Sequence, residues 1–167
     1  MMQSKFIMLK SDDQINKVIQ FCYKTGYASI DFETNGKPIN SPEFRPTILG
    51  ISPQPGISYI LPLCHDESVF KDKWKSKLKM LSGILESDKV VKVAWNLKFE
   101  QKILMLYGIT LGGRLFDAML AKYLLEEKRP NDLKSIVKKY IPDYSSYEDE
   151  VGKMATKVGW GNVPLKP

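Results

Sequence analysis

The sequence predicts an α/β protein in which a mixed β-sheet is flanked by helices. Apolar runs that predict antiparallel strands come first, and an alternation of strand and helix follows. The chain has 167 residues, enough for one domain with a substantial core. Its 43% hydrophobic and 26% charged content is typical of a globular protein, and no apolar run reaches membrane-spanning length. We therefore expect a single domain over residues 1–167 and no membrane partner.

Periodicity and turn residues place the elements in order. Ser11 and Gln14 form a capping box at the start of a helix, and Gly26 ends that helix. A Pro-Gln-Pro-Gly turn between two apolar runs predicts a hairpin. The expected strands cover residues 6–9, 27–33, 47–52, 57–63 and 89–94. The expected helices cover residues 11–26, 67–85, 96–106, 115–126 and 132–140.

The most informative motif is Asp31-Phe32-Glu33, at the end of a short apolar run. Side chains two residues apart on a strand share a face, so Asp31 and Glu33 are expected to lie side by side. Two neighbouring carboxylates repel each other unless a positive charge lies between them, and Mg²⁺ and Mn²⁺ prefer carboxylate oxygens. The alternative is a strand that ends in two solvated acids.

Asn96 and Glu100 are the next candidates, because they stand four residues apart on the helix that follows the 89–94 strand. A helix that leaves the carboxyl end of a strand puts its first turn at the ligand-binding edge of the sheet. Glu100 therefore reaches the same edge as Asp31 if their two strands run parallel. The alternative makes Asn96 an N-cap and Glu100 a first-turn acid that faces the helix dipole.

The charge and the cysteine content of the chain indicate which kind of partner it binds and in which compartment it lies. The formal net charge is +6 and the isoelectric point is about 9.2, which favours an anionic partner such as nucleic acid. Cys22 and Cys64 match no zinc spacing, and we interpret both as reduced thiols. We therefore expect a cytoplasmic protein.

Two motifs resemble those of the proofreading 3′–5′ exonucleases. Residues 28–34, Ala-Ser-Ile-Asp-Phe-Glu-Thr, resemble the first motif, and residues 95–104, Trp-Asn-Leu-Lys-Phe-Glu-Gln-Lys-Ile-Leu, resemble the second. Residues 115–125 and 132–137 continue the likeness. The resemblance is to the exonuclease domain of family-A DNA polymerases, of the bacterial polymerase I type and its phage relatives.

The resemblance implies a ribonuclease H-like three-layer fold with two divalent ions, Mg²⁺ or Mn²⁺, held by four carboxylates. It assigns Asp31, Glu33 and Glu100 as metal ligands and catalytic residues, although many family members carry Asp at the position of Glu100. It also implies that Thr34, Asn35 and Asn96 bind the substrate. The implied partners are the 3′ end of single-stranded DNA and a polymerase domain of the same polypeptide or gene, and the implied location is the cytoplasm of a bacterial or phage-infected cell.

The family's fourth carboxylate belongs to a Tyr-x-x-x-Asp motif on a later helix. Tyr144 and Glu148 have this spacing, with Glu in place of Asp, but they lie in a stretch without a helical pattern. Residues 160–165 resemble the approach to the motif. The chain is therefore expected to be the front part of a longer protein, cut before its third motif, and to cleave weakly or not at all on its own.

Other residues have structural interpretations. Asp117 lies in a matching segment, and a helix-start or packing role is expected for it. His65 is expected to be structural or exposed, and Phe32 and Phe99 match core stripes.

The sequence thus predicts a DNA-polymerase proofreading domain that hydrolyses the 3′-terminal phosphodiester of single-stranded or frayed DNA and releases nucleoside monophosphates. Two alternatives stay open. One is an exonuclease-like module that has lost its chemistry and serves in binding or assembly. The other is an RNA exonuclease of the ribonuclease D type.

Overall fold

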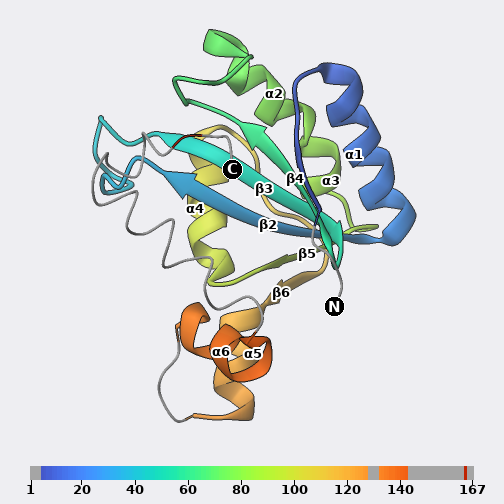
Figure 1. Ribbon diagram of the computed structural model, residues 1–167, viewed down its shortest axis with the longest axis vertical. Coiled ribbons are helices and arrows are strands. Elements are labelled where there is room, and N and C mark those ends of the chain that lie inside the picture. Colours follow the sequence, from blue (N-terminus) through green and yellow to red (C-terminus); the bar gives the residue numbers. More distant parts are fainter. Residues whose placement is uncertain (1–4, 128–131, 143–163, 165–167) are drawn as a thin grey trace.

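A six-stranded sheet forms the centre of the protein (Figure 1). The computed structural model describes residues 5–127, 132–142 and 164. The strand order is β1-β4-β3-β2-β5-β6, and parallel and antiparallel pairs both occur, which confirms the predicted mixed α/β sheet. The strands are β1 (Lys5–Met8), β2 (Tyr27–Thr34), β3 (Pro46–Gln54), β4 (Ile57–Pro62), β5 (Val91–Ala94) and β6 (Leu115–Asp117).

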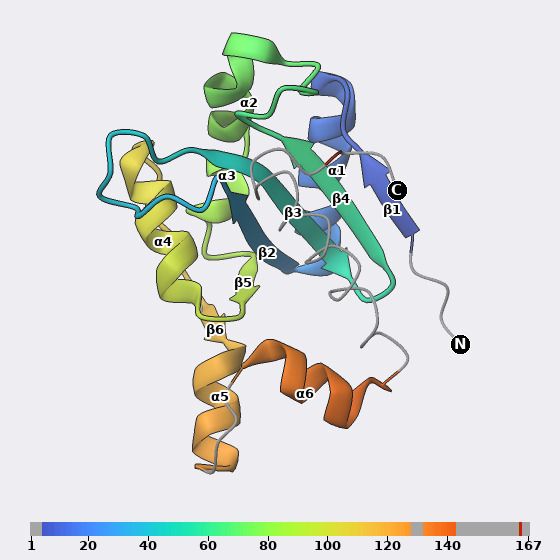
Figure 2. The same cartoon turned by 60° about the vertical axis from the view of Figure 1, so that its left-hand side comes forward.

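Helices cover one face of this sheet, and two more lie beyond its β6 edge (Figures 1 and 2). Helix α1 packs on β2 and β3, while α4 packs on β2 and β5. The pair α5 and α6 projects away from the sheet at the lower end of the molecule in both views. The α-helices are α1 (Asp12–Thr25), α2 (Trp74–Met80), α3 (Ser82–Leu85), α4 (Leu97–Leu106), α5 (Ala118–Leu125) and α6 (Leu133–Tyr140), and η1 (Lys71–Lys73) is a 3₁₀ turn.

Strand β2 shows why the two faces of the sheet differ. Its residues alternate, with Ala28, Ile30 and Phe32 buried under the helices. Asp31 and Glu33 point to the opposite face and are exposed. The alternation therefore places both acids on the face of the sheet away from the core, as the sequence predicts.

The pairing of β2 sets the geometry at its carboxyl end. It runs antiparallel to β3 and parallel to β5, with Ser29 opposite Val93. Strand β5 ends at Ala94, whereas β2 continues to Thr34. The parallel orientation on which the placement of Glu100 depended is thus confirmed, and α4 begins beside the last residues of β2.

The first helix and the hairpin form as predicted. The Ser11 side chain accepts a hydrogen bond from the Gln14 N–H at 3.3 Å, and Gly26 closes α1 with φ of 75°. Strands β3 and β4 pair antiparallel across a two-residue turn whose Gly56 has φ of 82°.

Two predicted helices differ from the structure. The helix expected at 67–85 begins only at Trp74, because Ser68 holds the preceding residues in a turn through bonds to Pro62 and Phe70. It is also interrupted at Leu81, where α2 gives way to α3. The helix expected at 115–126 begins at Ala118, because residues 115–117 instead pair with β5 as an edge strand. In the second case a tertiary pairing overrides local helical spacing.

Candidate active site

Asp31 and Glu33 lie near the carboxyl end of β2, where its regular pairing with β3 ends. Glu33 is opposite Ile48, but Thr34 is opposite Pro46, so one extra residue of β3 is inserted between them. Such a bulge bends the strand and changes the direction of the side chains beside it. The bulge therefore terminates the regular sheet directly after the two acids.

Glu100 approaches the same end of β2 from the first turn of α4. Because β5 ends at Ala94, it no longer pairs with β2 at Phe32. The Glu100 carboxylate accepts a hydrogen bond from the Phe32 backbone N–H at this position. Its side chain is therefore held against β2, close enough to Asp31 for the two charges to interact.

The surroundings of Glu100 disfavour its ionised form. Only 2% of the residue is exposed. Burial raises the pKa of Glu100 to about 7, backbone hydrogen bonds from Glu100 and Phe32 oppose that rise, and the negative charges of Asp31 and Asp117 add to it. Its Oε2 atom is buried and has no hydrogen-bond partner among the described residues. A buried carboxylate oxygen that has no donor, in a residue close to a second carboxylate, fits a cation.

The donor chemistry of this cluster fits Mg²⁺ or Mn²⁺, since all its side-chain ligands are carboxylate oxygens. The charge of Asp31 contributes to the raised pKa of Glu100, so these two carboxyl groups lie near each other. Glu33 lies two residues further along the same face of β2. Among the described residues, no three His, Cys, Asp or Glu side chains lie close enough together to hold one metal ion, so the three expected ligands do not form a single compact group in the structure.

Thr34 and Asn35, the first two expected substrate-binding residues, organise the loop that follows β2. The Asn35 Nδ2 donates to Glu43 O at 2.8 Å, and its Oδ1 accepts from the Arg45 N–H at 3.1 Å. The Thr34 hydroxyl accepts from the Gly36 N–H at 3.3 Å. Both side chains thus bond to the backbone of a loop next to the acids.

Asn96, the third expected substrate-binding residue, stands at the N-cap position of α4 with left-handed backbone angles, φ 61° and ψ 51°. Its side chain makes no capping hydrogen bond, so the interpretation of Asn96 as a side-chain cap is wrong. Asn96 therefore lies one helical turn from Glu100 with its amide uncommitted to the helix end.

Asp117 caps α5, which confirms its expected helix-start role. Its Oδ1 accepts from the N–H groups of Met119 at 3.0 Å and Leu120 at 3.3 Å. The same atom also accepts from the Asn96 N–H at 3.1 Å, a link across 21 residues that the sequence analysis missed. In the sequence, Asp117 stands directly before an apolar helical run, which indicates a helix cap. This pattern does not indicate the bond to Asn96.

The remaining residues have structural roles or lie outside the description. The His65 Nδ1 accepts from the Glu67 N–H at 3.1 Å, in keeping with its structural interpretation. Phe32 is buried and Phe99 packs against the core, which confirms both expectations. The Tyr144 to Glu148 segment lies outside the described residues.

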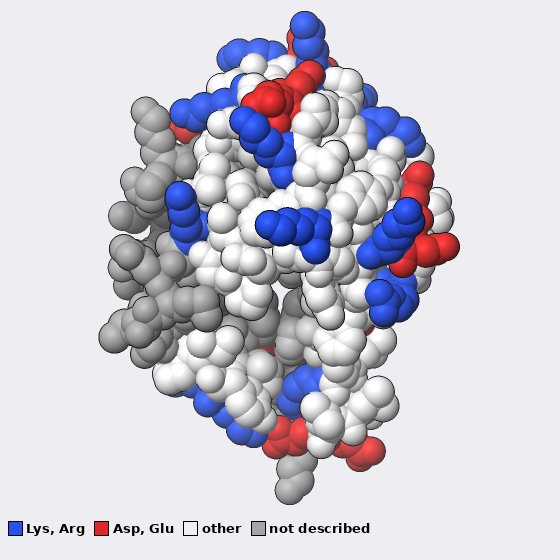
Figure 3. Space-filling view, turned by 90° about the vertical axis from the view of Figure 1, so that its right-hand side faces the viewer, with Lys and Arg blue, Asp and Glu red and all other residues white. Residues whose placement is uncertain are grey.

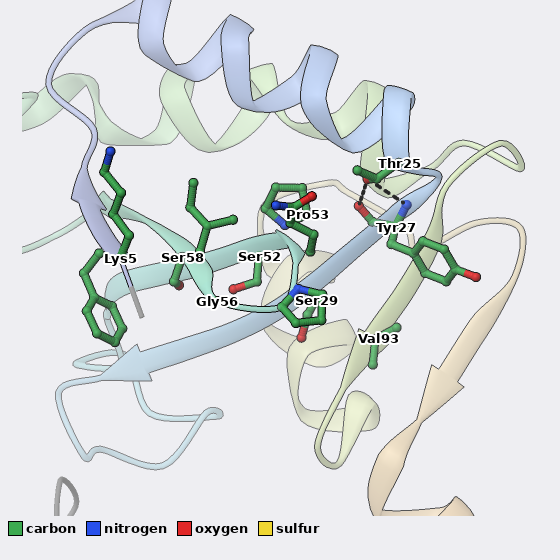
Figure 4. Close-up of a pocket in the computed structure, with 13 residues that line it drawn as sticks. Lys5, Thr25, Tyr27, Ser29, Ser52, Pro53, Gly56, Ser58 and Val93 are labelled. Carbon is green, nitrogen blue, oxygen red and sulfur yellow. Dashed lines mark hydrogen bonds between the residues drawn. The ribbon is translucent and has the colours of Figure 1, made fainter. Parts of the chain in front are cut away.

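A hollow of about 720 Å³ lies at the other end of β2 (Figure 4). Tyr27, Ser52 and Val93 contribute to its lining, together with the turn between β3 and β4. Neither Asp31 nor Glu33 lines it. The hollow is therefore separate from the carboxylate cluster.

The positive charge of the protein is dispersed on the side that Figure 3 shows. Lys and Arg side chains there are spread among uncharged residues and accompanied by acids, rather than gathered in one stripe. On α1, Asp13 forms an exposed ion pair with Lys17, and Asp12 pairs with the mostly buried Lys77.

The fold and the cluster together define an α/β protein with carboxylates at the carboxyl edge of a mixed sheet. The family model described as 3′–5′ exonuclease, of the family-A DNA polymerase type, matches residues 6–165. The chain belongs to this family, which confirms the resemblance seen in its motifs. A relative is DNA polymerase I of Synechocystis sp., 36% identical over 61 residues, which are 36% of this chain and 6% of that protein.

Solved structures share the fold at low sequence identity. Trypanosoma brucei RNase D in complex with RNA U12 has a TM-score of 0.74 at 8% identity and matches 99% of this chain and 56% of its own. Escherichia coli RNase D, an exoribonuclease, has a TM-score of 0.68 at 15% identity, over 96% of this chain and 38% of its own. Brucella melitensis NrnC with bound Mg²⁺ has a TM-score of 0.55 at 18% identity, over 84% and 61%.

This chain therefore spans about two fifths to three fifths of the lengths of these three proteins. None of the described helices is both long enough and apolar enough to cross a membrane.

Proposed function

We propose that this chain is the proofreading exonuclease domain of a DNA polymerase, acting on the 3′ end of single-stranded or frayed DNA. The family match and the similarity to DNA polymerase I of Synechocystis support this function. The observation that carries it is the buried Oε2 of Glu100, which has no partner among the described residues and lies beside the charge of Asp31. In its ionised form such an oxygen is costly to bury, and a bound cation would remove this cost.

In this proposal Asp31, Glu33 and Glu100 hold divalent cations. Two such ions would lower the pKa of bound water and stabilise the attacking and leaving oxygens of the phosphodiester. Asp31 shares a face of β2 with Glu33 and lies close enough to Glu100 for their charges to interact, so it is the acid that would help to hold both ions. Glu100 would have to lose its proton to hold a cation, and its pKa of about 7 means that this occurs near neutral pH.

The remaining site residues position the substrate. Thr34 and Asn35 shape the loop that follows the acids, and Asn96 begins the helix of Glu100. We assign these three to the terminal nucleotide. A 3′ end must leave its duplex to reach such a cluster, so mispaired ends, which fray easily, are the preferred substrate.

Two other functions are outcomes of the same test. The RNase D structures share this fold, which makes RNA the second candidate substrate. A module without catalysis would bind nucleic acid and leave it intact. We expect slow hydrolysis by this chain, because three carboxylates are assigned here and the family resemblance implies four.

The test is a Mn²⁺-dependent digestion of matched single-stranded DNA and RNA oligonucleotides labelled at the 5′ end. The wild-type chain should shorten DNA stepwise from the 3′ end, and Asp31→Asn should abolish this. The matched control is Asp13→Asn, which changes an exposed acid on α1 and should leave the rate unchanged. Faster digestion of RNA would select the RNase D type, and equal rates for wild type and Asp31→Asn would refute the proposed site.

A further inference from the structure

One oxygen atom of Asp117 joins three segments of the protein. Its Oδ1 accepts the N–H groups of Met119 and Leu120 at the start of α5, at 3.0 and 3.3 Å. It also accepts the N–H of Asn96 at 3.1 Å, directly before α4. Asp117 itself is the last residue of β6, opposite Ala94 at the end of β5. One half-buried carboxylate thus connects the ends of two strands to the starts of two helices.

The segment that it holds on the α4 side has an unfavourable backbone conformation. Asn96 and Lys71 are the non-glycine residues with positive φ in the described part of the chain. Such a conformation persists only where the surroundings enforce it. The Asn96 side chain contributes no capping bond. Its carbonyl accepts the Phe99 N–H within the same helix start, at 2.8 Å, so the bond from the Asn96 N–H to Asp117 is the one that ties this turn to another segment.

The restrained turn controls where Glu100 lies. Asn96 precedes α4, and Glu100 is in the first turn of that helix. The buried Glu100 carboxylate meets the Phe32 N–H and the Asp31 charge at the end of β2. A shift of the first turn would move this carboxylate away from Asp31, and displacements of about 1 Å at a reacting centre lower rates about 100-fold.

We propose that Asp117 is a positioning residue: by accepting the Asn96 N–H it fixes the start of α4, and with it the Glu100 carboxylate, against the end of β2. This inference rests on the proposed function, in which Glu100 is a metal ligand. Residues that orient metal ligands typically change metal affinity or activity about 10- to 100-fold when they are lost. Capping of α5 alone would affect stability and leave the metal site unchanged.

Three variants separate these roles. Asp117→Asn retains an oxygen acceptor without the charge. Asp117→Ser retains a good cap for α5 but shortens the side chain, which should break the bond to Asn96 while the protein still folds. Asp132→Ala is the matched control, because Asp132 caps another helix, α6, in the same way, through the Ser135 N–H at 2.8 Å.

The first readout is amide hydrogen exchange of Asn96 in the metal-free full chain, which does not depend on activity. Asp117→Ser should accelerate this exchange roughly tenfold or more, because a bonded amide becomes open to solvent. Asp117→Asn and Asp132→Ala should stay within about threefold of wild type. Unchanged exchange in Asp117→Ser would overturn the proposal.

The second readout is Mn²⁺ affinity from calorimetric titration of the same proteins. Asp117→Ser should weaken binding about 10- to 100-fold, and Asp117→Asn and Asp132→Ala only slightly. An equal loss in Asp117→Asn and Asp117→Ser would overturn the positioning role in favour of a charge effect. Asp31→Asn is included to test the proposed metal site separately from the positioning role of Asp117. Equal Mn²⁺ binding by Asp31→Asn and wild type would refute the proposed function. The hydrogen exchange of the Asn96 amide tests the positioning role by itself.

Discussion

Replacing Glu100 with Gln should stabilise the metal-free protein at alkaline pH. The Glu100 carboxyl has its pKa raised from 4.5 to about 7, chiefly by burial. Because the folded protein binds this proton more tightly than the unfolded chain does, the free energy of unfolding falls as pH rises from about 4.5 to about 7 and stays low above that range. The shift corresponds to roughly 3 kcal/mol at pH 8, as an upper limit.

Glutamine has nearly the same shape and carries no charge, so Glu100→Gln removes this cost. We expect the free energy of unfolding of the variant to exceed that of wild type by about 1–3 kcal/mol at pH 8 in EDTA. At pH 4.5 the difference should be close to zero. For a protein of this size that gain raises the melting temperature by about 2–4 °C per kcal/mol. Urea and thermal unfolding, followed by circular dichroism at both pH values, measure the difference.

The matched control is Glu43→Gln, which changes an exposed acid that pairs with Lys37 on the surface. Its stability should match that of wild type at both pH values, because exposed ion pairs contribute little. Two results would show that the buried charge of Glu100 does not destabilise the protein: a Glu100→Gln variant that is less stable than wild type at pH 8, or one whose stability increases equally at both pH values.

Three further predictions concern other parts of the molecule. Mn²⁺ should raise the melting temperature of wild type more at pH 8 than at pH 5.5, because an ionised Glu100 binds it, and should have no such effect on Asp31→Asn. Gly113→Ala should lower the free energy of unfolding in urea titrations by about 1 kcal/mol or more beyond the effect of Gly108→Ala. Both glycines have positive φ, but a Cβ at Gly113 would lie 2.6 Å from Asp88 Cα, whereas a Cβ at Gly108 would meet nothing within 4 Å. Burial raises the pKa of Cys22 to about 12, so iodoacetamide at pH 8 should label Cys64 first by mass spectrometry, and faster labelling of Cys22 would contradict this.

Local patterns were sufficient to predict the elements that position the acids. The alternation in β2 gave the faces of Asp31 and Glu33, and the capping box and Gly26 gave the ends of α1. The helical spacing of α4 gave a Glu100 that faces the sheet. In each case the determining interactions lie within a few residues, where sequence periodicity reports them directly.

The interactions that the sequence did not predict join distant segments. β6 is only three residues long and forms because β5 supplies its hydrogen bonds. The bond from Asn96 to Asp117 depends on that same pairing. The bulge after Glu33 likewise depends on how β3 meets β2. No local periodicity encodes such contacts, and for this reason the sequence indicated the ligand types but not the links that hold them.

The most direct test of the proposed metal site is a pH titration of the Glu100 side-chain carboxyl by ¹³C NMR, with and without Mg²⁺. We expect a midpoint near pH 7 in the metal-free protein. In saturating Mg²⁺ the midpoint should fall by about one unit or more, and in Asp31→Asn it should show no Mg²⁺-dependent fall. A midpoint that Mg²⁺ leaves unchanged in the wild-type chain would contradict the assignment of Asp31 and Glu100 to a common cation.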